Sequence, residues 1–244
     1  MLQLYTGTPG SGKSYHAVRE GLWQARRKLV VANFAVSNAP ELRQLENGRW
    51  VGWMHISDDD MSVGAMIGIY DKYLREIHRE SSALWIMDEA QRKFNTREWN
   101  QPERKDWVTF ASLHRHLGFD GILVVQDLSL LDGQMGAMCQ EQMRHRRVNR
   151  HMPFKWVPFM PPVFATVTYQ MHTKLKGELG LLFLKKKVAA RYDSLQVFDM
   201  GRLSALFGRG IGSPARSPAE RGPARGTVAR GPVRVPSNGA QVGK

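Results

Sequence analysis

A glycine-rich stretch near the start of the sequence has the residue types and spacing that bind phosphate groups. Gly7, Gly12, Lys13 and Ser14 fit the pattern Gly-x-x-x-x-Gly-Lys-Ser in full. Glycines let such a loop curl so that its N–H groups point at the phosphates, while the lysine contacts the β- and γ-phosphates and the serine holds Mg²⁺. An apolar run precedes the stretch and a helical pattern follows it, which is the context that the motif requires. The residues expected to contact ATP are Gly7, Thr8, Pro9, Gly10, Ser11, Gly12, Lys13, Ser14 and Tyr15.

Two adjacent carboxylates, Asp88 and Glu89, follow a continuous apolar run at 83–87. Such a run is typical of a strand that is buried on both faces. At the end of that strand, Asp88 is expected to hold the same Mg²⁺ as Ser14, and Glu89 to act as a general base that polarises the attacking water. A carboxylate pair after a strand can also cap a helix. The phosphate-binding pattern upstream favours the catalytic interpretation.

Gln126 ends a second apolar run, at 121–125. A polar side chain in this position points at the carboxyl edge of the sheet, where ligands bind in open α/β folds. Gln126 is therefore a candidate catalytic residue that senses the γ-phosphate or orients water. A strand-end glutamine without any chemistry fits the sequence equally well, so the pattern leaves this choice open.

A densely basic segment spans residues 143–150. One of its arginines is expected to reach the nucleotide of a neighbouring subunit as an arginine finger, which neutralises charge in the transition state. We take Arg146 as the candidate finger, although the sequence does not distinguish it from its neighbours. Two alternatives are contacts with DNA phosphates and a solvated edge strand whose charges prevent aggregation.

The rest of the sequence indicates the elements that must position these residues. Strands are predicted at 2–6, 29–33, 83–87 and 121–125, and helices at 12–27, 61–79 and 103–117. This alternation predicts an α/β fold with a mostly parallel central sheet flanked by helices, as in P-loop NTPases. Residues 34–60 are harder to interpret, with one possible strand at 49–56.

The sequence divides into three parts. Residues 1–150 are predicted to form the P-loop ATPase core. Residues 151–208 are predicted to be a small C-terminal extension of the same domain, with a possible edge strand at 163–169 and a helix at 185–200. Residues 209–244 are rich in Gly, Pro, Ala and Arg without periodicity, which predicts a disordered basic tail.

The composition of the chain indicates its cellular compartment and the kinds of partner that it binds. The chain has 244 residues and is 42% hydrophobic, which is enough for one sizeable core. Its only cysteine, Cys139, cannot form an internal disulfide, which fits a reducing compartment. We find no signal peptide and no apolar run of about 18 residues, so no spanning helix is expected. The formal net charge of +13 favours nucleic acid or an anionic membrane face as partner, and a basic tail that only aids solubility is the alternative.

Several motifs occur in the order typical of one known family. Over about residues 1–200 the chain resembles the zonular occludens toxin (Zot) family, which includes the gene I assembly proteins of filamentous phages. The motifs that carry the resemblance are the phosphate loop with Tyr15 after it, Met-Asp-Glu-Ala at 87–90, His-Arg-His-Leu-Gly at 114–118, Val-Val-Gln-Asp at 124–127, the basic residues 144–147 and Tyr-Asp-Ser at 192–194.

The resemblance implies a phage morphogenesis ATPase that uses ATP and Mg²⁺ to drive assembly and export of single-stranded DNA virions. It assigns Lys13 and Ser14 to phosphate and Mg²⁺, and Asp88 and Glu89 to Mg²⁺ and water. The implied partners are further copies of the chain in a ring, phage single-stranded DNA or its packaging complex, phage coat protein and membrane assembly proteins.

The chain departs from the family pattern after its motifs. Family members usually continue into a transmembrane helix and a periplasmic domain, whereas this sequence continues into the basic tail. The expected location is therefore the host cytoplasm, at the cytoplasmic face of the inner membrane, which the chain would reach through membrane partners or by contact of its tail with anionic lipid.

Two other function classes fit a phosphate loop near the start of a chain. A small-molecule or nucleotide kinase is one, but no arginine-rich lid is evident, and the positions of Asp88, Glu89 and Gln126 suit a motor ATPase better. A nucleotide-gated adaptor that binds ATP without hydrolysing it is the other. A phosphoryl acceptor would identify the kinase, and tight binding without turnover would identify the adaptor.

Overall fold

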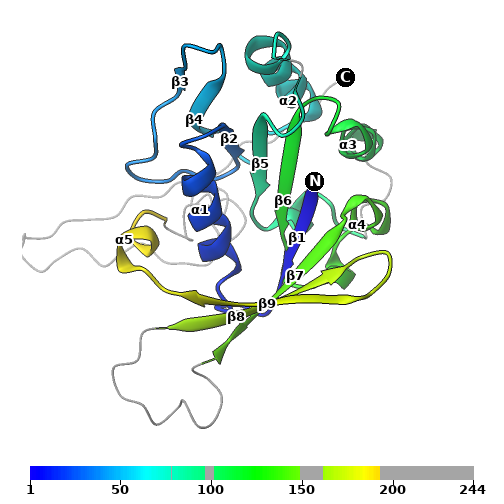
Figure 1. The fold of residues 1–244 in the computed structure, drawn as a ribbon. Coiled ribbons are helices and arrows are strands. Elements are labelled where there is room, and N and C mark those ends of the chain that lie inside the picture. Colours follow the sequence, from blue (N-terminus) through cyan, green and yellow to red (C-terminus); the bar gives the residue numbers. More distant parts are fainter. Residues whose placement is uncertain (78, 97–101, 149–161, 193–244) are drawn as a thin grey trace, which may run out of the picture. The chain divides into compact units, whose positions relative to one another are not determined.

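A nine-stranded sheet forms the centre of the described part of the chain (Figure 1). The structure is a computed structural model and describes residues 1–77, 79–96, 102–148 and 162–192. The strand order is β3-β4-β2-β5-β6-β1-β7-β8-β9. The strands are β1 (Leu2–Thr6), β2 (Leu29–Ala32), β3 (Arg43–Gln44), β4 (Trp50–His55), β5 (Ala83–Met87), β6 (Phe119–Val124), β7 (Glu141–Arg147), β8 (Val163–Gln170) and β9 (Lys176–Phe183).

Most of the sheet is parallel. The strands β4, β2, β5, β6, β1 and β7 run in the same direction, while β3, β8 and β9 pair antiparallel with their neighbours. Parallel strands need crossover connections. Helices supply most of them here, whereas the connection from β2 to its parallel neighbour β4 contains β3 and no helix. The predicted α/β fold with a mostly parallel central sheet flanked by helices is confirmed.

Helices cover both faces of the sheet (Figure 1). Helix α1 (Lys13–Gln24) packs on one face, and α2 (Val63–Ile69), α3 (Pro102–Leu113) and α4 (Gly133–Met138) pack on the other. On that second face Trp85 of β5 stacks on Trp107 of α3, with ring centroids 5.2 Å apart. The shorter helical elements are the π-helix η1 (Tyr70–Leu74), the 3-10 turns η2 (Ala90–Arg92) and η3 (Leu128–Leu130), and α5 (Lys186–Ala189).

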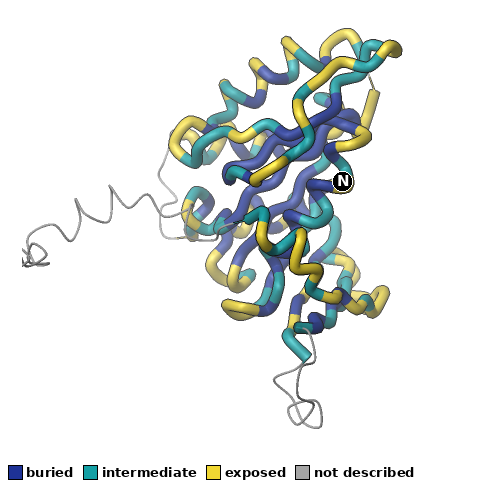
Figure 2. The backbone as a smooth tube through the Cα atoms, turned by 90° about the vertical axis from the view of Figure 1, so that its left-hand side faces the viewer, coloured by how far each residue is buried: buried dark blue, intermediate teal, exposed yellow. Residues whose placement is uncertain are grey.

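The central strands are buried on both faces, as their apolar runs indicate. Every residue of β2 and of β5 is buried, and Figure 2 shows the buried strands between the outer elements. Such strands read as continuous apolar runs because neither face meets water. Among the residues that the structure describes, no helix has the length and apolarity that crossing a membrane requires.

The strand order determines which residues meet at the carboxyl edge of the sheet. Strand β6 lies between β1 and β5, with Tyr5 paired to Val124 and Met87 paired to Leu123. The segments that follow these three strands are therefore neighbours, although they are far apart in the sequence. The N–H of Gly7 donates to the carbonyl of Gln126 at 3.2 Å, which joins the first two segments directly.

Two expectations about edge strands are wrong. The basic segment that begins at residue 143 lies in β7, which pairs with both β1 and β8 and is not an edge. The predicted edge strand at 163–169 is β8, but it too is interior, because β9 pairs with its far side. The last strand, β9, was not predicted, since its sequence contains two glycines and alternates poorly.

Helix boundaries also differ from the predictions. The helix expected at 61–79 is α2 followed by the π-helix η1, and the helix expected at 103–117 ends at Leu113. The helix expected at 185–200 is wrong beyond its first turn, because α5 ends at Ala189 and Tyr192 is not helical. The rest of that helix, 193–200, lies outside the described residues, as does the predicted tail at 209–244.

Candidate nucleotide-binding site

The phosphate-loop sequence forms a tight loop between β1 and α1. Gly7 has φ +146°, and a Cβ at this position would lie 2.4 Å from the carbonyl oxygen of His145, so the loop passes too close to β7 for any side chain. Gly10 has φ +73°. The N–H of Ser11 donates to the carbonyl of Thr8 at 3.1 Å, which closes the turn. The loop leads directly into the N-terminus of the 12-residue helix α1. The free N–H groups at this helix end favour the binding of an anion.

Lys13 lies inside the loop rather than in solvent. The residue is 7% exposed, and its Nζ donates to the carbonyl of Thr8 at 3.3 Å. Burial lowers the pKa of Lys13, while the negative charges of Glu89 and Asp88 act in the opposite direction. The ammonium group is thus held within electrostatic reach of both predicted carboxylates.

Asp88 is fixed by a hydrogen bond at every polar group. The side chain of Asn33 accepts from its N–H at 2.8 Å and donates to its carbonyl at 2.9 Å. Of the carboxylate oxygens, Oδ1 accepts from the N–H of Glu89 at 2.9 Å, and Oδ2 accepts from the hydroxyl of Tyr192 at 2.6 Å. Asp88 is only 3% exposed, so the orientation of its carboxylate is set by these partners.

Glu89 and Gln126 meet across the sheet edge. Glu89 has φ +51°, a left-handed conformation that is uncommon for a residue with a side chain, and it begins the turn η2. Its Oε2 accepts from the Nε2 of Gln126 at 3.3 Å and also from the side-chain amide of Gln91. The structure therefore brings the predicted base into contact with the exposed strand-end glutamine.

Ser14 and Asp88 share one neighbour, the hydroxyl of Tyr192. Burial raises the pKa of this hydroxyl most, the charge of Asp88 and the hydrogen bond to it raise it further, and a hydrogen bond with the Ser14 side chain lowers it. A hydroxyl oxygen and a carboxylate oxygen around one point are the hard ligands that Mg²⁺ takes from proteins, with nucleotide phosphates and water as the others. These residues fit the Mg²⁺ that the phosphate-loop pattern implies.

Tyr15 lies on the first turn of α1 and faces the end of β9. Its hydroxyl donates to the carbonyl of Phe183 at 3.0 Å and accepts from the N–H of Lys185 at 2.9 Å. Both contacts use the backbone of the segment that leads to Tyr192. Tyr15 thus ties this segment to the phosphate loop; its predicted contact with nucleotide stays a prediction.

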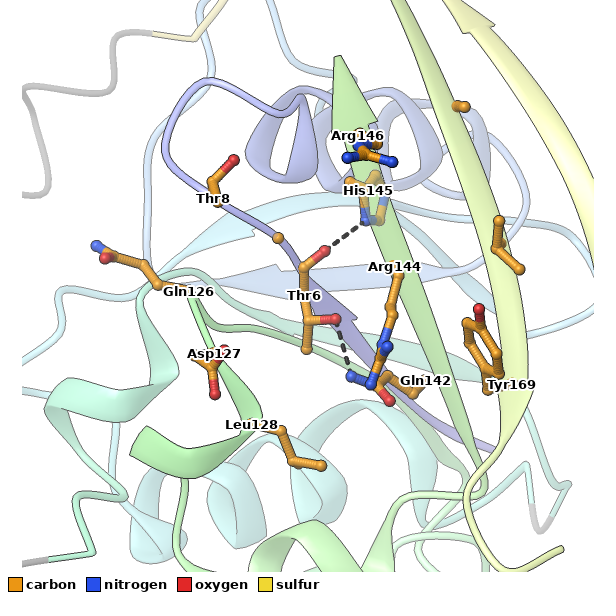
Figure 3. A pocket seen from close by; sticks show the side chains of 13 residues that line it. Thr6, Thr8, Gln126, Asp127, Leu128, Gln142, Arg144, His145, Arg146 and Tyr169 are labelled. Carbon is orange, nitrogen blue, oxygen red and sulfur yellow. Dashed lines mark hydrogen bonds between the residues drawn. The ribbon is translucent and has the colours of Figure 1, made fainter. Parts of the chain in front are cut away.

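Arg146 lines a pocket of about 690 Å³ beside the phosphate loop (Figure 3). Arg144 and Arg146 point to the same face of β7 because side chains alternate along a strand. Across the pocket lie Thr8 and Gln126, and the guanidinium of Arg144 sits 5.0 Å from the ring centroid of Tyr169. The candidate finger is therefore close to the phosphate loop of its own subunit.

A pair of histidines, half-buried His16 and buried His145, connects the phosphate loop to β7. His16 Nδ1 and His145 Nε2 are 2.9 Å apart, and His145 Nδ1 lies 3.3 Å from the carbonyl of Thr6. Burial lowers the pKa of His16 to about 4 and that of His145 to about 3. Both rings stack or tilt against Tyr5, so the loop is anchored by neutral imidazoles.

Sequence reasoning assigned no role in the site to Asn33, Tyr192 or the histidine pair, although Tyr192 begins the Tyr-Asp-Ser motif of the family resemblance. Asn33 directly follows the apolar strand β2, which is the same signal that identified Gln126, so this residue was within reach of the pattern. Tyr192 is 104 residues away from its partner Asp88, and no spacing in the sequence indicates their contact.

These features define the class of the protein. A phosphate loop after β1, carboxylates after β5 and a glutamine after the intervening strand β6, on a mostly parallel sheet, give the fold of a P-loop NTPase. Residues 1–177 match the family described as Zonular occludens toxin (Zot), and the chain belongs to this family. The resemblance seen in the sequence is thereby confirmed.

The chain is also similar to individual phage proteins. It is 32% identical over 233 residues to the Gene 1 protein of Enterobacteria phage fd, and 31% identical over the same length to that of Enterobacteria phage M13. Each match covers 83% of this chain and 61% of the relative, so the chain spans about 61% of the length of these relatives.

Solved structures with a similar arrangement have low sequence identity to the chain. The N-terminal domain of zonular occludens toxin from Neisseria meningitidis is 19% identical, with 79% of this chain and 98% of that chain covered and a TM-score of 0.48. The genome packaging NTPase B204 from Sulfolobus turreted icosahedral virus 2, in complex with ATP-gammaS, is 13% identical, with coverages of 74% and 95% and a TM-score of 0.46.

Proposed function

We propose that this chain is a P-loop ATPase that powers filamentous phage assembly and the export of single-stranded DNA virions at the host inner membrane. The observation that carries the enzymatic part is the meeting of Lys13, Glu89 and Gln126 at one sheet edge, beside the buried carboxylate of Asp88. Membership of the Zot family and the likeness to phage Gene 1 proteins support the biological part.

Each residue has a role that its position supports. The loop from Gly7 to Ser14 surrounds the phosphates with N–H groups, and Lys13 neutralises charge on the β- and γ-phosphates. Ser14 and Asp88 would hold Mg²⁺, which supplies further neutralisation of the phosphates when it is bound. Glu89 takes the proton of the attacking water, and Gln126 orients Glu89 through the 3.3 Å hydrogen bond.

The net positive charge of the chain and its membership of the Zot family support the partners that we propose. We expect further copies of the chain in a ring, with Arg146 as the finger between subunits, and phage single-stranded DNA or its packaging complex as the substrate that is moved. Coat protein and membrane assembly proteins would bring the chain from the host cytoplasm to the cytoplasmic face of the inner membrane. The division into a core at 1–150, an extension at 151–208 and a disordered tail at 209–244 is part of this proposal.

Steady-state ATP hydrolysis by the wild type and by Glu89→Gln, with and without single-stranded DNA, tests the enzymatic proposal. We expect turnover in the wild type, stimulation by DNA, and loss of turnover with retained ATP binding in Glu89→Gln. Binding without turnover in the wild type, in oligomers and with DNA present, would identify an adaptor instead. Transfer of phosphate to a small acceptor would identify a kinase.

Phage release tests the biological proposal. Lys13→Ala should abolish both ATP turnover and the release of virions, because the phosphates lose their main cation. A normal yield of virions from cells in which Lys13→Ala is the only copy would contradict a role in assembly.

Deletion of 209–244 should lower DNA affinity and flatten its dependence on salt if the tail contacts phosphates.

A further inference from the structure

The hydroxyl of Tyr192 lies at the point where the two predicted Mg²⁺ ligands meet. It donates to Asp88 Oδ2 at 2.6 Å, and the Ser14 side chain is a second hydrogen-bond partner. The other carboxylate oxygen of Asp88 accepts from the N–H of Glu89 at 2.9 Å. Among the described residues, each carboxylate oxygen therefore has one donor, which leaves one lone pair for a cation or for water bound to it.

The segment that carries Tyr192 is fixed at both ends. Tyr15 of α1 holds the backbone of Phe183 and Lys185 at 3.0 and 2.9 Å, ahead of α5. After α5, the N–H of Ser37 donates to the carbonyl of Arg191 at 2.9 Å. The ring of Tyr192 packs edge-on against Phe34, with centroids 5.0 Å apart. These contacts fix the position of the phenol relative to the phosphate loop. The hydrogen bond from Tyr192 to Asp88 is therefore part of a packed segment.

We propose that Tyr192 is a positioning residue of the Mg²⁺·ATP site, whose hydroxyl fixes the Asp88 carboxylate beside Ser14 in the orientation that the nucleotide-bound cation requires. This inference rests on the proposed function, because it takes the site to bind Mg²⁺ and ATP. Without the phenol, Asp88 Oδ2 would lose its only protein donor among the described residues. The carboxylate would then lose part of its orientation and bind the cation more weakly.

Binding of a fluorescent, non-hydrolysable ATP analogue at increasing Mg²⁺ concentrations tests the proposal without requiring turnover. Tyr192→Phe removes only the hydroxyl and keeps the ring against Phe34. We expect the half-saturating Mg²⁺ concentration to rise about tenfold, the usual effect of losing a hydrogen bond to a charged group. Affinity for the analogue in the presence of EDTA should change by less than about twofold. The matched control is Tyr73→Phe, since Tyr73 packs against Trp50 on the far part of the sheet.

Three outcomes overturn the proposal, and a fourth separates it from the proposed ATPase activity. An unchanged Mg²⁺ dependence, or a loss of affinity that is equal with and without Mg²⁺, would show that Tyr192 only packs the segment. A lower half-saturating Mg²⁺ concentration would show that the hydroxyl competes with the cation. Absence of Mg²⁺-dependent binding in the wild type would overturn this proposal together with the proposed function. Binding without hydrolysis, with the expected shift in Tyr192→Phe, would overturn the ATPase alone.

Discussion

Asn33 pairs with Asp88 through both main-chain groups of the aspartate. Its Oδ1 accepts from the N–H of Asp88 at 2.8 Å, and its Nδ2 donates to the carbonyl at 2.9 Å. Strands β2 and β5 end at Ala32 and Met87, so the side chain of Asn33 continues their pairing beyond the sheet. Both residues are 3% exposed, and water cannot replace these bonds. The orientation of a predicted metal ligand therefore depends on a neighbouring strand.

Asn33→Ala should reduce both stability and turnover. It leaves the buried N–H and carbonyl of Asp88 without partners, and each such group costs about 1–3 kcal/mol. We expect the free energy of unfolding, measured by urea denaturation, to fall by about 2 kcal/mol or more. The control is Asn47→Ala, because Asn47 is exposed and accepts from the N–H of Arg49 at 3.2 Å. Equal losses in the two variants would contradict this account.

Gln126 and Gln91 both donate to Glu89 Oε2, but we expect them to contribute differently. Gln91 belongs to the same turn as Glu89, whereas Gln126 reaches it from β6 and its carbonyl accepts from the N–H of Gly7 at 3.2 Å. Gln126 therefore connects the base to the phosphate loop. Gln126→Ala should lower kcat about tenfold or more with little change in KM, and Gln91→Ala should lower it less. An equal or larger loss in Gln91→Ala would assign the positioning of Glu89 to its own turn.

Stability should fall in mild acid because of the pair formed by His16 and His145. Their pKa values in the folded protein, about 4 for His16 and about 3 for His145, are below the usual 6.5. Below the usual value the unfolded chain binds protons that the folded chain does not, so stability declines as the pH falls from about 6.5 toward 4. Each histidine should cost on the order of 2 kcal/mol at about pH 5 relative to neutral pH, since one pKa unit equals 1.36 kcal/mol.

Replacing one histidine isolates this effect. His145→Gln keeps an amide that can donate to the carbonyl of Thr6 but does not titrate, so the free energy of unfolding should vary less between neutral pH and about pH 5. His172→Gln is the control, because His172 is exposed on the loop before β9. A pH profile that is unchanged in His145→Gln would show that other groups cause the loss in acid.

The sequence predicted the parts of the site that follow local rules. The phosphate loop is one continuous motif, and Asp88, Glu89 and Gln126 each follow an apolar strand, so parallel strand ends place them together. Asn33 obeys the same rule after β2. The contact of Tyr192 with Asp88 could not be predicted, because it depends on α5 ending at Ala189 and joins residues that are 104 positions apart. Whether β7 is an edge strand likewise depends on β8, which follows it after a long connection and which no local pattern links to it.

Arg146 is positioned to act on a nucleotide, in its own subunit or in a neighbouring one. Arg146 lines a pocket with Thr8 of its own phosphate loop, so it can act on the nucleotide of its own subunit or on that of a neighbour. Arg146→Ala and Lys13→Ala should each be inactive alone. If Arg146 acts between subunits, mixing the two variants should restore turnover, because Arg146→Ala subunits supply intact loops and Lys13→Ala subunits supply the arginine.

The mixture is informative in either direction. Arg144→Ala is the matched control, since Arg144 lies on the same face of β7 but packs over the ring of Tyr169, and we expect it to retain most DNA-free turnover. Arg146→Lys should stay impaired, because lysine keeps the charge but lacks the planar fork of donors. Turnover that stays absent in the mixture, under conditions where the subunits associate, would place Arg146 in its own site. Full activity of Arg146→Ala alone would show that Arg146 is not an arginine finger, and that its side chain contacts DNA or solvent instead.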